Sequence, residues 1–344
     1  MNITFLIGNG FDVGMGLKSK FSDYFPIYIE ESKEKDNSIK ALADDIEINR
    51  AEWSYFEKKL GEYTEKFSPK NQKNFFVQLR DFELGFIDYL TLEQYSLEYN
   101  ETKIKEVFTK ALKTYYSISN LADESVRKIK AVYTFYEKSE RIFNFINFNY
   151  TNVLERCISC ITDGKIAERR IGTTLYVDKI GRIENVHGFI GALPLMGLND
   201  ESQIKNKELA NDPKFRKRII KPLLNKTNRT NNDSRATELI NKSQIICIYG
   251  MSLGETDKKW WQLLLKWIVS DGNRQLIIFD YDENYTESSQ FDWIDKQDSI
   301  LDILTSYAEE PIDMESISSR IHIAVHKNIF ALNLRKKESI AKSA

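Results

Sequence analysis

The chain has 344 residues, 42% of them hydrophobic, and its 49 Lys and Arg residues nearly balance 51 Asp and Glu residues. This length is enough for one or two domains with a large core. The net charge of -2 excludes the Lys and Arg excess of a general nucleic-acid binder, so we expect no nucleic-acid partner.

The first predicted element is a short strand followed by a glycine turn. The apolar run Ile3–Ile7 leads into Gly8, Asn9, Gly10, Phe11 and Asp12. Glycines in this place let backbone N–H groups approach a diphosphate at a helix start. The pattern lacks the Gly-Lys-Ser/Thr of a P-loop and misses the strict dinucleotide spacing. A ligand loop and a tight turn with Asp12 as helix N-cap are therefore both open.

A long helical region is predicted next, over residues 19–140. The stretch WSYFEKKLGEYTEKF places Trp53, Phe56, Leu60, Tyr63 and Phe67 on one face of a single helix, and two later stretches repeat that period. We interpret this region as a helical insertion that serves as a lid, a sensor or a partner surface. It would interrupt an α/β domain made of residues 1–18 and 141–335, which a mobile tail, 336–344, would follow.

Further short apolar runs indicate the remaining strands. They are Arg141–Asn149, Glu184–Gly188, Gln244–Gly250, Arg274–Asp282 and Arg320–His326, and the last alternates in polarity as an edge strand does. Such strands, interleaved with helices, are typical of a parallel sheet covered on both faces. We predict an α/β, Rossmann-type fold with a mostly parallel sheet, helices on both faces and an all-helical insertion after the first strand.

Ligands bind outside the carboxyl ends of the strands in such sheets, so the residues after each strand are informative. Asn147 and Asn149 share one face of the second strand, and Thr151 opens the helix after it. Capping and ligand binding are equally open for this asparagine pair. His187 follows the third strand and precedes a glycine. Its imidazole either bonds a loop or takes a proton near pH 7.

The two later strands also end in hydrogen-bonding groups. Gly250, Ser252 and Leu253 form a turn into a helix, which suits hydrogen bonds to ribose or phosphate. Asp280, at the end of the next strand, can accept hydrogen bonds from ribose hydroxyls. Together, these strand ends are typical of a site that binds a dinucleotide and deprotonates a hydroxyl or water.

Metal binding and a membrane span are both disfavoured. Cys157 and Cys160 form a single Cys-x-x-Cys without a second pair, so we interpret them as buried apolar side chains. His322 and His326 lack an acidic third ligand. Three cysteines and no apolar run of membrane-spanning length indicate a cytoplasmic protein.

Two basic stretches, Lys214–Pro222 and Arg127–Lys130, could either bind phosphate or be solvated. We favour a solvated helix face or turn, because charged runs of this length are usually exposed.

Several motifs resemble the bacteriophage abortive-infection AbiH family, which is associated with anti-phage defence. In chain order they are IGNGFD, WSYFEKKL, FNYTNVLE, VHG, MGLND and YGMSLGETDKKWW. AbiH proteins in turn resemble the sirtuin-like, NAD-binding fold.

That second resemblance implies roles for individual residues. Gly8, Asn9, Gly10, Phe11 and Asp12 match the phosphate loop. Asn149 matches the asparagine that orients the nicotinamide ribose and the attacking water, and His187 matches the histidine base. Gly250 and Ser252 match the turn facing the adenosine half, and Asp280 matches the strand end near the adenine ribose. The four-cysteine zinc module and the Gly-Ala-Gly loop of deacylating sirtuins are missing, which disfavours a protein deacylase.

The leading hypothesis is an anti-phage protein that consumes NAD by cleaving the nicotinamide–ribose bond. One alternative is a nucleotide-binding sensor without turnover that responds to a phage or host trigger protein, alone or as a homo-oligomer. A less favoured alternative is a metal-dependent nuclease that uses Asp12, Glu57 and other acidic residues.

Overall fold

In the computed structural model, the described residues are 1–117, 119–192, 194–228, 230–281 and 290–335. The predicted tail, 336–344, lies outside them, as does Asp282 at the end of one predicted strand.

One seven-stranded sheet forms the centre of the described part. In spatial order its strands are β3 (Lys165–Ile171), β4 (Thr174–Asn185), β2 (Ile142–Asn147), β1 (Asn2–Ile7), β5 (Ile245–Tyr249), β6 (Gln275–Asp280) and β7 (Ile321–Val325). Neighbouring strands are parallel except for the β3–β4 pair. The predicted α/β fold with a mostly parallel sheet is confirmed, and β7 is the edge strand that its alternating polarity indicated.

The β3–β4 hairpin was not predicted from the sequence. Four of the seven residues of β3 (KIAERRI) are charged, which is compatible with a strand that is largely exposed or half-buried. β4 begins far upstream of the predicted strand Glu184–Gly188 and ends at Asn185, so His187 lies just beyond it.

Helices cover both faces of the sheet, as predicted. On one face, Phe5 and Phe145 join a core with α1 (Asn9–Gly14), α7 (Glu101–Thr114), α8 (Asp123–Phe135) and α9 (Val153–Ser159). On the other face, Leu6 and Ile248 join a core with α13 (Asn232–Lys242), α14 (Lys258–Val269), α15 (Gln290–Thr305) and α16 (Met314–Ser318). The near-continuous apolar strands follow from this two-sided burial.

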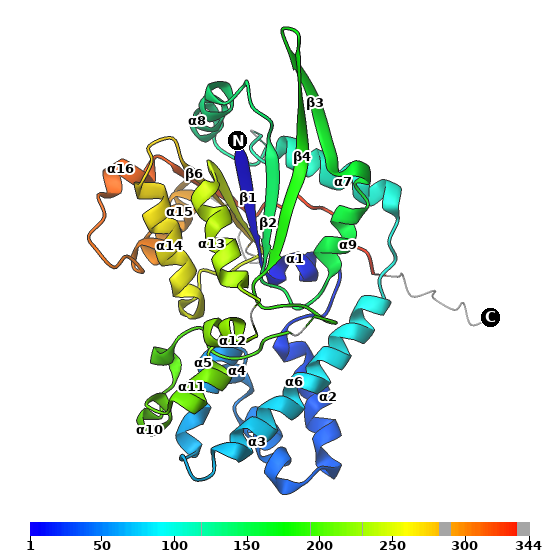
Figure 1. The fold of residues 1–344 in the computed structure, drawn as a ribbon, viewed down its shortest axis with the longest axis vertical. Helices are drawn as coiled ribbons and strands as arrows, with labels where there is room; N and C mark the ends of the chain where they lie inside the picture. The colour runs from blue at the N-terminus through cyan, green and yellow to red at the C-terminus, as the bar shows by residue number, and fades with distance from the viewer. Residues whose placement is uncertain (118, 193, 229, 282–289, 336–344) are drawn as a thin grey trace, which may run out of the picture.

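A third core, which we call the helical lobe, lies beyond the carboxyl ends of the strands (Figure 1). It contains α2 (Phe21–Glu31), α3 (Asn37–Ile48), α4 (Arg50–Trp53), α5 (Phe56–Tyr63) and α6 (Gln72–Tyr95), together with residues 196–220. That last segment includes α10 (Lys207–Ala210) and α11 (Pro213–Ile219) and leads into α12 (Lys221–Thr227). The lobe is therefore built from two segments of the chain, one that precedes β2 and one that follows it.

The single helix predicted over Trp53–Phe67 is wrong. The helix breaks at Ser54 and Tyr55, where Tyr55 has the non-helical backbone angles φ -98° and ψ 62°. The break lets the Trp53 indole N–H donate to Asp45 at 2.9 Å while Phe56 still packs against the Trp53 ring.

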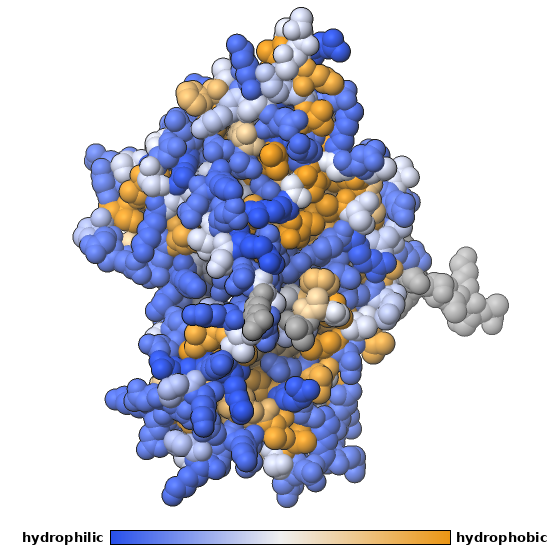
Figure 2. Space-filling model, in the orientation of Figure 1, coloured by the Kyte–Doolittle hydropathy of each residue, from blue (hydrophilic) through white to orange (hydrophobic). Residues whose placement is uncertain are grey.

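The surface is mostly hydrophilic on the face shown in Figure 2, and apolar side chains gather where β4 lies next to α7 and α9. None of the described helices is both long enough and apolar enough to cross a bilayer.

Candidate functional site

The two predicted glycine turns meet at the centre of the sheet. After β4 the chain crosses to β5 on the other side of β1, which makes the β1–β5 boundary the topological switch point where such sheets bind ligands. The Gly8 N–H donates to the Tyr249 carbonyl at 2.9 Å, and the Gly10 N–H donates to the Gly250 carbonyl at 2.8 Å. A Cβ on Gly10 would lie 2.7 Å from the Gly250 Cα. Close loop contact therefore explains these glycines without a ligand, and their role in diphosphate binding stays a prediction.

We expect Gly250→Ala to lower the free energy of unfolding by about 2 kcal/mol or more. Gly250 has φ +69°, and an added Cβ would lie 2.6 Å from the Phe11 backbone nitrogen. Gly254→Ala is the matched control, because Gly254 has φ -74° and its added Cβ meets no atom closer than 3.6 Å. Urea unfolding measures both variants, and equal losses would contradict this reading of the turn.

Asp12 lies inside α1, so it does not cap that helix; Gly8 holds the N-cap position. The Asp12 side chain is 1% exposed, and its Oδ2 accepts a hydrogen bond from the Thr151 hydroxyl at 2.6 Å. Its buried Oδ1 has no hydrogen-bond partner in the described chain. Burial raises the pKa of Asp12 to about 7, against the opposing Thr151 hydrogen bond and with a smaller contribution from Glu155. The carboxyl group is therefore poised to change charge near neutral pH.

This pKa predicts a pH-dependent stability. Because the folded pKa exceeds the ordinary value of 3.8, the contribution of Asp12 is fully present below about pH 4 and is lost as the pH rises through 7. Wild type should therefore lose stability relative to Asp12→Asn over this range, by up to about 1.4 kcal/mol per pH unit. Urea unfolding of both proteins from pH 4 to 8 measures the difference, and parallel curves would contradict it.

The two neighbouring residues of the glycine turn have structural contacts. Phe11 is fully buried, and its ring packs against Phe108 and Phe330 in the core. The Asn9 side-chain oxygen accepts a hydrogen bond from the Ser19 hydroxyl at 2.6 Å.

The structure separates the roles of the two asparagines at the end of β2. The Asn147 side-chain oxygen accepts from the Asn149 backbone N–H at 3.1 Å, so Asn147 performs the local capping. The Asn149 side chain is also buried, at 4% exposed, but neither its Oδ1 nor its Nδ2 has a hydrogen-bond partner in the described chain. Leaving a buried polar group unpaired costs about 1–3 kcal/mol. A hydrogen-bonding group from outside the chain, either water or a ligand, would remove this cost.

His187 lies beside this strand end. The Val186 N–H donates to the Asn147 carbonyl at 3.0 Å, which holds the segment against β2. The imidazole packs edge-on against Phe148 and nearly parallel to Tyr150, at centroid distances of 5.7 and 5.9 Å. Burial, with a contribution from the Lys221 ammonium, lowers the pKa of His187 well below its ordinary value. The ring is therefore neutral at pH 7, and its lowered pKa makes it a weak base that takes a proton only from a strongly acidified donor.

Three charged side chains and one amide lie next to His187, and we call these residues, Glu57, Asn199, Lys221 and Asp257, the charge cluster; Asn199 and Lys221 are buried, and the two carboxylates are partly buried. Lys221 is 2% exposed and forms an ion pair with Glu57. The Asn199 amide donates to Asp257 Oδ1 at 3.1 Å and to Glu57 Oε2 at 3.3 Å. Burial and the Glu57 charge raise the pKa of Asp257, and Lys221 opposes them. The solvated reading of Lys214–Pro222 is therefore wrong for Lys221.

Three residues of the charge cluster lie in sequence motifs, although the hydrophobic periodicity of the sequence does not mark them. Glu57, Asn199 and Asp257 lie in WSYFEKKL, MGLND and YGMSLGETDKKWW, three of the motifs that carry the family resemblance. Their convergence on one point could have been inferred from the motifs, but the partner Lys221 lies in none of them.

A cavity of about 10 Å³ joins His187 to the charge cluster, with Asn199, Lys221 and Trp260 among its lining residues. This volume holds about one water molecule. The pocket therefore has room for about one water next to the neutral imidazole.

The structure brings Asp12, Asn149, Thr151 and His187 together at the ends of β1, β2 and β4 and the start of α1. The remaining predicted residues lie on the other half of the sheet. Ser252 is exposed, the Leu253 carbonyl accepts from the Tyr307 hydroxyl at 3.0 Å, and Asp280 pairs with Lys296 at 3.2 Å. Their predicted contacts with a cofactor stay predictions.

The sequence matches a model of a known protein family. The family model described as bacteriophage abortive infection AbiH matches residues 4–280, and no curated protein matches the sequence. The matched region runs from β1 to β6 and contains the helical lobe, His187 and the charge cluster. Because this model covers well over half of the chain, the protein belongs to the AbiH family of bacteriophage abortive-infection proteins.

Proposed function

We propose that this abortive-infection protein hydrolyses NAD at the nicotinamide–ribose bond, with Asn149 and His187 as its catalytic residues. The observation that carries the proposal is the Asn149 amide, which is buried at the end of β2 with both polar atoms unpaired. The unpaired Asp12 oxygen lies at the end of the neighbouring strand β1. Ribose hydroxyls, which both donate and accept hydrogen bonds, would satisfy these groups.

The chemistry requires few protein groups. The bond from ribose C1′ to the nicotinamide nitrogen breaks through an oxocarbenium-like state, and the nicotinamide leaves with the bonding electron pair. A water oxygen then bonds to C1′, and its proton passes to His187 and on to solvent. A placed general base contributes about 10²–10⁴-fold to such a step.

Support for a dinucleotide comes from the strand order. The six parallel strands follow the order β4-β2-β1-β5-β6-β7, the doubly wound arrangement whose central crevice binds dinucleotides. In the proposal, NAD lies along this edge with its nicotinamide ribose at Asn149. The Gly8–Gly10 and Gly250–Ser252 turns lie beneath the rest of the dinucleotide.

We further propose that the helical lobe gates the site. The cavity beside His187 has room for a single water, so NAD can enter only if the lobe moves relative to the sheet. A phage or host trigger protein would drive this motion, which would protect an uninfected cell from losing its NAD. Equal NAD turnover in cells before and after infection would contradict the gate.

The test of hydrolysis is direct. Purified protein is mixed with NAD, with and without extract from phage-infected cells, and free nicotinamide is followed over time. Wild type should release nicotinamide, and Asn149→Ala and His187→Ala should not. An inactive wild type under both conditions, or full activity in both variants, would refute the proposal.

A second candidate is a nucleotide-binding sensor without turnover, and the surface of α6 favours it. Leu92 and Tyr95 on this helix are 70% and 76% exposed, and Leu84 is 51% exposed. Large exposed apolar side chains on one helix suit contact with a partner protein. Calorimetry that shows NAD binding to the wild type, with no nicotinamide released, would favour this function over hydrolysis.

A further inference from the structure

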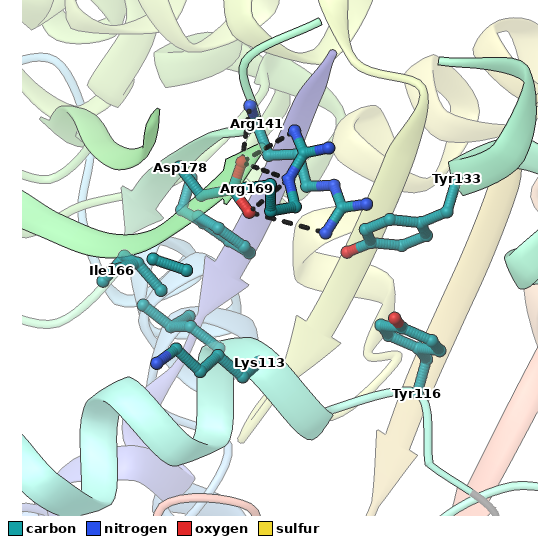
Figure 3. A pocket seen from close by; sticks show the side chains of 10 residues that line it. Lys113, Tyr116, Tyr133, Arg141, Ile166, Arg169 and Asp178 are labelled. Atoms are coloured by element: carbon teal, nitrogen blue, oxygen red, sulfur yellow. Dashed lines mark hydrogen bonds and ion pairs between the residues drawn. The ribbon is translucent and has the colours of Figure 1, made fainter. Parts of the chain in front are cut away.

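A second cavity lies beside Arg141, which precedes β2, and thus at the opposite end of the strands from His187, which follows β4. Figure 3 shows the residues that line it. Its volume is about 80 Å³, several times the roughly 10–15 Å³ that a single water needs. Arg141 precedes β2, Arg169 and Asp178 lie on β3 and β4, and Lys113 lies on α7. The cavity therefore lies where the sheet meets α7 and α8, outside the proposed catalytic site.

The lining carries an excess of positive charge. Arg141, Arg169 and Lys113 contribute three positive charges, and Asp178 contributes one negative charge. The formal charge of the lining is thus +2. Lys113 is exposed and has no ion pair within the described residues, so its ammonium can turn toward a ligand.

The guanidinium groups of the two arginines differ in how many of their N–H donors have hydrogen-bond acceptors. Arg169 Nε lies 3.0 and 3.1 Å from the two Asp178 oxygens. Its Nη1 and Nη2 donate to the backbone carbonyls of Glu137 and Ser139 at 3.0 and 2.7 Å. All three nitrogen atoms of the Arg169 guanidinium group therefore donate hydrogen bonds within the protein, and this side chain stabilises the fold.

Arg141 is only partly satisfied. Its Nη1 makes one long contact of 3.4 Å to Asp178, and its Nε is buried with no hydrogen-bond partner in the described chain. The guanidinium lies 4.2 Å from the Tyr133 ring centre, and Tyr133 in turn stacks on Tyr116. Figure 3 shows the two tyrosine rings on one side of the cavity, with the arginines above and Lys113 below. A partly buried guanidinium that lies over a ring and makes a single long contact to a carboxylate has N–H groups left to bind an anion.

We propose that this cavity binds a phosphate group, either free or as a phosphomonoester. A phosphate carries about -1.5 to -2 charges at pH 7, which matches the +2 of the lining, whereas one carboxylate would leave a positive charge uncompensated. Its oxygens accept from the free side of the Arg141 guanidinium and from Lys113 together.

Calorimetric titration with inorganic phosphate, at constant ionic strength, tests the proposal. Saturable binding is expected for wild type, with at least about tenfold weaker binding for Lys113→Gln and for Arg141→Gln. Lys110→Gln is the matched control, because Lys110 is an exposed lysine on the same helix that does not line the cavity. It should bind phosphate like wild type.

Two further arms define the ligand and its independence from the first site. A nucleoside 5′-monophosphate that binds more tightly than inorganic phosphate identifies a phosphomonoester, and equal binding identifies the free anion; both support the phosphate site. Asn149→Ala should bind phosphate like wild type, because the two sites lie at opposite strand ends.

Three outcomes would overturn the proposal: no saturable binding of phosphate by wild type, wild-type affinity in Lys113→Gln, or succinate binding as tight as phosphate binding. Lys113→Gln keeps the test valid if Arg141→Gln fails to fold, since Lys113 is exposed and unpaired.

Discussion

Replacing Asn149 with alanine is expected to reduce NAD hydrolysis by at least about 100-fold while leaving the protein nearly as stable as the wild type. The two effects separate because the Asn149 amide makes no hydrogen bond in the described chain. Its removal relieves an unpaired buried group worth about 1–3 kcal/mol, which offsets the packing lost with the side chain. A placed polar group in a dry site typically contributes about 10²–10³-fold to the rate.

Asn147→Ala is the matched control for this variant. Asn147 lies two residues earlier on the same strand, but its side chain accepts from the Asn149 N–H and donates to Glu155 at 3.3 Å. Its loss should cost about 1–2 kcal/mol of stability, since both bonds are local to the fold. Thermal unfolding and nicotinamide release measure the two quantities. A strongly destabilised Asn149→Ala protein would show that the amide has a structural role instead.

Lys221→Met is expected to lower the free energy of unfolding by about 2–4 kcal/mol, because it leaves the partly buried carboxylates of Glu57 and Asp257 without their cation. Methionine has a similar length, so the loss reflects charge rather than a cavity. The double variant Lys221→Met with Glu57→Gln should recover much of the loss, since it removes the uncompensated charge that the single change creates.

Urea unfolding at pH 7 measures this effect. Lys226→Met is the matched control, because Lys226 lies on the same helix α12 but is exposed, and it should change stability by less than about 0.5 kcal/mol. If Lys221→Met unfolds at the wild-type urea concentration, the ion pair does not hold the lobe to α12.

Most of the sheet could be predicted because its signal is local. Runs such as Ile3–Ile7 are apolar at nearly every position, and two-sided burial in a parallel sheet produces that pattern. The β3–β4 hairpin escaped prediction for the same reason: its exposed, charged strands carry little of the apolar signal. The helix break at Ser54 and Tyr55 was also not predicted, because the aromatic residues before and after it keep the spacing of a continuous helix.

The sequence predicted where some of the candidate residues lie in the fold, and their roles stay predictions. The rule that ligands bind at strand ends identified Asn149 and His187, and the structure brings them to one edge with Asp12 and Thr151. The glycines were expected to clear space for a diphosphate; the structure shows that the two turns also pack on each other, and the diphosphate role stays a prediction. Glycine permits close approach of any backbone, and the sequence cannot state whether the neighbour is a ligand or another loop.

The sequence by itself determined the fold class, the long helical region after β1 and the family, because hydrophobic periodicity and short motifs are encoded in neighbouring residues. Only the tertiary structure decided which polar side chains have partners. Asn147 and Asn149 look alike in the sequence, yet one is bonded and the other is not. Lys221 and Glu57 are 164 residues apart, and nothing local marks them as a pair. Such pairing depends on how distant segments pack, since burial turns an ordinary charge into one that requires a partner.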